Sequence, residues 1–142
     1  MPVRDIKVGR KTETATPRPR EEPVRRIILL SGEWWIPDSL FHLEATIFTG
    51  ADGAAQGEIF WTNIDTMYLA PNACGTELVR GSLDGKGLEL RGYRVDGPLV
   101  TDYYLIALIG EETSGQFEGR SEAFGIWDGR LSGTYQIVEE RD

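Results

Sequence analysis

The feature that most constrains this chain is a series of short runs, each ending at a glycine-bearing turn, in which apolar and polar residues alternate. Residues 102–138 contain three such runs, and none has the length or the 3.6-residue spacing of an amphipathic helix. In the middle run, residues 115–122, Phe117 and Ser121 share one face and Gln116 lies on the other. This alternation predicts three consecutive antiparallel strands, each with one buried face.

The same pattern continues back to residue 26, and it predicts eight strands in all. Their expected ranges are 26–31, 40–48, 57–64, 76–83, 87–95, 102–110, 115–122 and 131–138. Asp84-Gly85 and Asp128-Gly129 are typical of hairpin turns, and we expect the last two strands to be joined at the second pair. Eight antiparallel strands with short connections are enough to close a barrel that is filled by side chains or holds one small ligand. The predicted fold is therefore all-β, a single eight-stranded antiparallel up-and-down barrel of calycin-like type over 26–142, with a two-sheet sandwich as the alternative.

The first 25 residues differ from the rest in composition. They hold four of the seven prolines and few large apolar groups, which is typical of a segment that does not fold alone. Of the 15 basic and 23 acidic residues, eight basic and four acidic ones lie in residues 1–26, so this part carries +4 and the remainder −12. Two interpretations stay open, a flexible solubilising arm and a lid that docks over a ligand. The lid would use Val3, Ile6, Val8, Glu21 and Glu22.

Charge and composition also limit the partners. A formal net charge of −8 argues against nucleic acid, since binding to phosphates depends on Lys and Arg. The first residues have no apolar core of a signal peptide, and no run of 18 apolar residues occurs, so we expect no membrane partner and a cytoplasmic location. The single cysteine, Cys74, fits a reducing compartment. A homodimer is compatible with exposed edge residues.

The chain offers little for proton transfer or metal binding. His42 is the only histidine and Cys74 the only thiol, and no His/Cys cluster occurs, so we expect neither cofactor nor metal. What the chain does offer is four Trp, five Tyr and five Phe. These side chains either fill the barrel or line an apolar pocket that has a few polar groups. The pocket hypothesis places substrate against Trp61, Tyr68, Tyr93, Tyr103, Tyr104, Trp127, Tyr135 and His42, with Gln116 as a catalytic hydrogen-bond donor.

Several short motifs resemble one known family. A DG hairpin followed by LELRGY, and a late SGQFEG strand before a Trp-bearing hairpin, are similar to the small barrel cyclases of actinobacterial spirotetronate and spirotetramate pathways. Those proteins look like allene oxide cyclase barrels and act as Diels–Alderases. The resemblance covers roughly Gly32 to Ile137, and calycin-like barrels of lipocalin or avidin type share much of it. It implies a barrel capped by an N-terminal segment, in which aromatic and amide side chains position a linear polyene polyketide for a (4+2) cycloaddition. The positions matched by motif are Gln116, Trp127, Tyr103 and Tyr104.

Three functions follow as alternatives. The first is a cofactor-independent cyclase, because holding diene and dienophile in a reactive fold is worth about 7–11 kcal/mol in well-oriented intramolecular reactions. The second is a carrier or sensor of a small apolar ligand, which needs the same pocket and no chemistry. The third is an interaction module whose barrel is filled by its own side chains.

Overall fold

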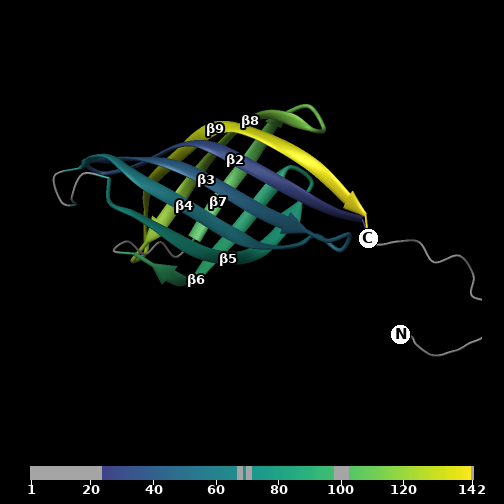
Figure 1. Cartoon of the computed structure of the whole chain (residues 1–142), viewed down its shortest axis with the longest axis horizontal. Helices are drawn as coiled ribbons and strands as arrows, with labels where there is room; N and C mark the ends of the chain where they lie inside the picture. Colours follow the sequence, from purple (N-terminus) through teal and green to yellow (C-terminus); the bar gives the residue numbers. More distant parts are fainter. Residues whose placement is uncertain (1–23, 67–68, 70–71, 98–102, 142) are drawn as a thin grey trace, which may run out of the picture.

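The chain forms one closed barrel of eight antiparallel strands (Figure 1). The computed structural model describes residues 24–66, 69, 72–97 and 103–141. The strands are β2 (Val24–Ile36), β3 (Ser39–Thr49), β4 (Ala54–Thr66), β5 (Cys74–Asp84), β6 (Gly87–Asp96), β7 (Tyr103–Gly110), β8 (Ser114–Ala123) and β9 (Ile126–Arg141). Each strand pairs with the next, and β2 also pairs with β9, which closes the barrel. The predicted barrel is confirmed, and the sandwich alternative is wrong because the hydrogen-bonded ring has no break between two sheets.

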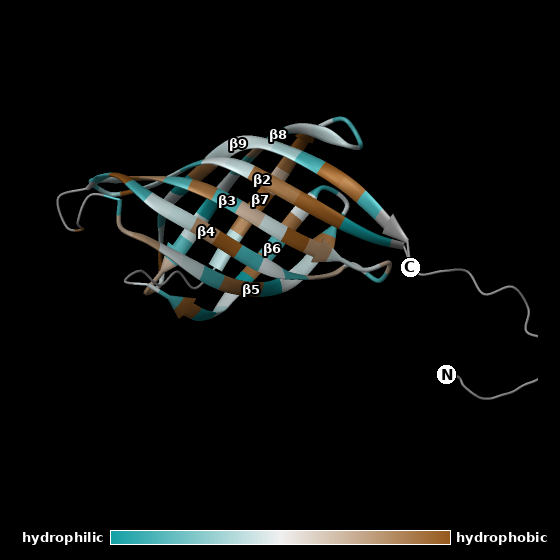
Figure 2. Cartoon of the chain, in the orientation of Figure 1, coloured by the Kyte–Doolittle hydropathy of each residue, from teal (hydrophilic) through white to brown (hydrophobic). Residues whose placement is uncertain are grey.

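The core is built by the two-residue alternation of the strands. In β3, Phe41, Leu43, Ala45 and Ile47 point inward and are buried, while the residues between them are half-buried or exposed. Figure 2 shows the same change from hydrophobic to hydrophilic along neighbouring strands. Burying one apolar side chain of this size contributes about 1.5–3 kcal/mol, so the alternation fixes the register of each strand.

Inward-facing glycines let the strands approach one another closely where the barrel wall bends. A Cβ atom on Gly32 of β2 would lie 2.0 Å from the carbonyl oxygen of Ser132 in β9. A Cβ atom on Gly57 of β4 would lie 2.0 Å from the carbonyl oxygen of Thr46 in β3. Any larger residue at either position would push the paired strands apart.

The first and last strands are longer than predicted. The first expected strand ended at residue 31, but β2 continues to Ile36 and includes both tryptophans. The turn expected at Asp128-Gly129 is wrong, because both residues lie inside β9 and the chain reverses at Phe124-Gly125. Gly129 serves another purpose, since a Cβ atom there would lie 1.7 Å from Oγ of Ser121.

The arm expected at residues 1–25 lies almost wholly outside the described residues, and its lid hypothesis remains a prediction. Val3, Ile6, Val8, Glu21 and Glu22 all belong to that part of the chain. Within the part that is described, no helix has the length and apolar character needed to cross a membrane.

Candidate functional site

The barrel interior has two chemically different ends. One end, where β3 meets β4 and where the chain enters and leaves the barrel, is lined by aliphatic side chains such as Ile28, Ile47 and Leu108. The opposite end contains large aromatic rings together with buried polar groups. We call it the aromatic–acidic end and define it by Trp34, Phe41, Trp61, Asn63, Glu77, Tyr104 and Ser121.

Four rings of this end pack against one another. The centroid of Trp34 lies 5.1 Å from that of Phe41 and 6.3 Å from that of Tyr104, and the centroid of Phe41 lies 5.4 Å from that of Trp61. These distances and the tilted planes are those of favourable aromatic pairs. The Trp61 ring also lies against the backbone of Gly75, where a Cβ atom would be 2.6 Å from Cζ2 of the indole. Glycine at position 75 therefore makes room for the ring.

Polar groups are buried among these rings. The Tyr104 hydroxyl donates a hydrogen bond to the Glu77 carboxylate, and only 3% of Glu77 is exposed. Trp34 Nε1 donates to Ser121 Oγ at 2.9 Å, also in the interior. Burying a carboxylate costs several kcal/mol unless it is well hydrogen-bonded. An interior filled by apolar side chains would avoid this cost in folding free energy.

Within the described part of the chain, the shortest strand pairing of the barrel lies beside this cluster. Among the described residues, β6 pairs with β7 only from Gly87 to Arg91, although β6 continues to Asp96. The far part of β6 pairs with β5, where Val95 is opposite Glu77. Tyr104 lies at the start of β7, opposite Leu90. The Glu77–Tyr104 pair therefore spans the interior close to the point at which the described β6–β7 pairing ends.

The structure brings together only part of the predicted pocket. Trp61 and Tyr104 are in the aromatic–acidic end. Tyr135 is buried near the other end, where its hydroxyl donates to the backbone carbonyl of Glu111 at 2.5 Å. Tyr68 lies outside the described residues.

The other predicted lining residues lie on the outer face of the barrel, so their assignment to the interior is wrong. Gln116 is exposed because its neighbour Phe117 takes the inward position of β8. Tyr103 is displaced in the same way by Tyr104, and its ring lies 6.2 Å from that of Trp127. Tyr93 and Trp127 are exposed.

His42 is also on the outer face, since it alternates with the buried residues of β3. Its Nε2 atom lies 3.2 Å from Oε2 of Glu44, and both side chains are substantially exposed. The His42–Glu44 pair therefore lies on the outside of the barrel wall, and the aromatic–acidic end lies inside it.

Glu77 is a buried acid of this end that the sequence analysis did not single out. The signal was present in β5, where Gly75, Glu77 and Val79 share one parity and are all buried. An acid in phase with inward-facing apolar residues is a buried carboxylate by strand geometry alone. Among the described residues, no group of three or more His, Cys, Asp or Glu side chains could hold a metal ion.

Comparison with known proteins gives no match to a family model, a curated protein or a solved structure. The geometry of the barrel interior and of its surface is therefore the basis for assigning a function.

Proposed function

We propose that the aromatic–acidic end binds an apolar small molecule that carries one hydrogen-bonding group, and that the protein folds this guest for an intramolecular (4+2) cyclisation without a cofactor. The single observation that supports the binding step is the Glu77–Tyr104 hydrogen bond inside a cluster of four aromatic rings. Small-molecule sites have this make-up, a mostly apolar lining with a few placed polar groups.

Among the described residues, buried carboxylates lie only at this end of the barrel, which favours a functional role over a purely structural one. The other end is filled mainly by aliphatic side chains, and the Tyr135 hydroxyl there donates to a backbone carbonyl. A carboxylate and a tyrosine hydroxyl add specificity of geometry but little net stability in such a place. Residues that lower stability without a structural need tend to be functional.

Entry of a guest requires the aromatic rings to move, because Phe41, Leu43, Ile59 and Tyr104 have no exposed surface. Flat rings that separate can accept a conjugated chain between them with little loss of contact area.

The cyclisation step needs positioning rather than proton transfer. A polyene held between Trp34, Phe41 and Trp61 would have its diene and dienophile brought together, and this orientation supplies much of the barrier reduction. The Tyr104 hydroxyl, turned from Glu77 toward the guest, or Glu77 in its protonated form, would donate to a carbonyl conjugated with the dienophile. We therefore assign to the Glu77–Tyr104 pair the role of hydrogen-bond donor that the sequence suggested for Gln116.

Binding is tested by titration with N-phenyl-1-naphthylamine, an uncharged probe that fluoresces in apolar surroundings. Trp61→Leu should weaken saturable binding at least tenfold. Phe60→Leu is the matched control, because Phe60 is the next residue of β4 and points outward, and it should change the dissociation constant less than twofold. Equal effects of the two substitutions, with both variants folded by circular dichroism, would remove the interior from the binding step.

Cyclisation is tested by incubating the protein with a linear polyene that carries a tethered diene and dienophile. Liquid chromatography with mass spectrometry should show an isomer of unchanged mass and new retention time, formed faster than without protein. Recovery of bound but unchanged polyene would leave a carrier or sensor and exclude the cyclase.

A second candidate is an interaction module with a filled barrel. It is favoured by the complete burial of interior side chains such as Phe41 and Ile59. This candidate predicts that no apolar probe binds saturably to the interior, so the first titration separates it from both small-molecule functions.

A further inference from the structure

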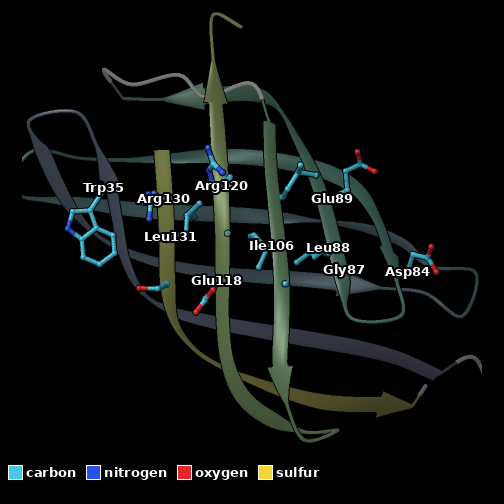
Figure 3. Close-up of a pocket in the computed structure, with 14 residues that line it drawn as sticks. Trp35, Asp84, Gly87, Leu88, Glu89, Ile106, Glu118, Arg120, Arg130 and Leu131 are labelled. Carbon is cyan, nitrogen blue, oxygen red and sulfur yellow. The ribbon is translucent and has the colours of Figure 1, made fainter. Parts of the chain in front are cut away.

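A shallow groove of about 790 Å³ runs over the outer face of the barrel, across β6, β7, β8 and β9 and the end of β2 (Figure 3). Trp35 lies at one side of it, and Glu89 and Asp84 lie at the other. Its exposed lining residues, such as Leu105 and Arg130, alternate along the strands with buried lining residues such as Ile106 and Leu131, so the groove lies on the outer side of the barrel wall.

One cross-strand row of the groove combines apolar and basic side chains. Trp35 of β2 is opposite Arg130 of β9, Arg130 is opposite Arg120 of β8, and Arg120 is opposite Leu105 of β7. Trp35 and Leu105 are 38% and 42% exposed, which is a large solvent-facing area for two apolar residues. The row is thus an adjacent pair of guanidinium groups with an apolar contact surface on each side.

The positive charges of Arg120 and Arg130 are not neutralised by carboxylates of the described part of the chain, although the barrel carries many acidic residues. Like charges directly opposite each other on neighbouring strands destabilise a sheet. Arg120 donates a hydrogen bond to the carbonyl oxygen of Trp127 at 2.7 Å. Within the described residues, however, neither guanidinium has a carboxylate within 4.0 Å, although residues 27–142 carry a formal −12.

The acid of β8 that lines the groove does not neutralise the two arginines. Glu118 faces the same groove two residues from Arg120, but its cross-strand partner is Ser132. Figure 3 shows Glu118 on the β8 strand apart from the two arginines. A pair of uncompensated cations on an acidic protein indicates a site for an anion, because arginines bind carboxylate and sulfonate groups through paired N–H donors.

We propose that this groove binds an amphipathic organic anion, with its carboxylate or sulfonate between Arg120 and Arg130 and its apolar body on Trp35 or Leu105. The site is distinct from the interior and does not depend on the proposed cyclisation. The acids at the far side of the groove, Asp84 and Glu89, disfavour a ligand with a second negative charge there.

The probe is 8-anilinonaphthalene-1-sulfonate, and its uncharged analogue N-phenyl-1-naphthylamine has the same ring skeleton without the sulfonate. Fluorescence titration of the full chain should give saturable binding of the sulfonate that weakens as salt is raised. Arg130→Gln should raise its dissociation constant at least tenfold. Arg94→Gln removes the same charge at an exposed position of β6 outside this groove. This control should change the dissociation constant of the sulfonate less than twofold.

Glu118→Gln supplies an independent test, because removing an acid that lines the groove beside Arg120 should tighten binding of the sulfonate by twofold or more. Neither Arg130→Gln nor Glu118→Gln should alter binding of the uncharged analogue, which reports on the site proposed in the interior. The proposal is overturned if the sulfonate does not bind saturably, if Arg130→Gln and Arg94→Gln have equal effects, or if the uncharged analogue displaces the sulfonate from a shared site.

Discussion

Removing the Tyr104 hydroxyl should expose the energetic role of the buried acid. Tyr104→Phe keeps the ring and its packing on Trp34 but leaves the Glu77 carboxylate without the hydrogen bond that the hydroxyl donates. A hydrogen bond to a charged group contributes about 1.5–3 kcal/mol, and neither side chain can turn to water because both are buried. For a domain of this size, 1 kcal/mol corresponds to roughly 4 °C, so the midpoint of thermal unfolding should fall by about 6–12 °C.

The matched control is Tyr135→Phe, the same chemical change at another buried tyrosine. The Tyr135 hydroxyl donates to the backbone carbonyl of Glu111, an uncharged acceptor, so its loss should cost only about 0.5–1.5 kcal/mol. Urea denaturation followed by circular dichroism measures both free energies of unfolding. In the double variant Glu77→Leu/Tyr104→Phe, the loss should be smaller than in Tyr104→Phe alone, because the buried charge is removed together with its donor. If Tyr104→Phe costs no more than Tyr135→Phe, the carboxylate is not held as described.

Four further substitutions have defined outcomes. Phe124→Asn should raise the free energy of unfolding by about 1 kcal/mol, because Phe124 has a positive φ of 56°, which asparagine adopts with less strain than phenylalanine, and its side chain is 87% exposed. Gly57→Ala should prevent closure of the barrel and abolish the cooperative transition, whereas Gly85→Ala, with a φ of 63° and no atom within 4 Å of its new Cβ, should cost only about 1 kcal/mol. Trp34→Phe should cost about 1–3 kcal/mol, since Ser121 Oγ loses its donor in the interior, and the same denaturation assay checks each value.

The barrel could be predicted from the sequence because strand alternation and glycine-bearing turns are local signals. In β3 four apolar residues share one parity over the whole strand, and these are the residues that the structure buries. The last turn was misplaced because Asp128-Gly129 has typical turn residues, whereas Phe124 is unusual at a reversal. At Phe124-Gly125 both φ values are positive, 56° and 85°, which is the backbone that a two-residue hairpin turn requires.

The candidate site was harder to predict because it depends on which face of each strand points inward. Tyr103 and Tyr104 are adjacent, so only one of them can enter the interior, and composition does not say which. Gln116 was assigned to a pocket by its chemistry, although the alternation around Phe117 already placed it on the opposite face. The pairing of Glu77 with Tyr104 joins β5 to β7 and is set by closure of the barrel, which no local pattern contains.

The most direct test of the central claim is where a bound apolar guest lies. Isotope-filtered NMR on the complex with N-phenyl-1-naphthylamine should show intermolecular nuclear Overhauser effects to the ring protons of Trp34 and Trp61. Contacts only to outward-facing residues such as Leu105 and Phe60, or no saturable complex at all, would contradict a ligand site inside the barrel.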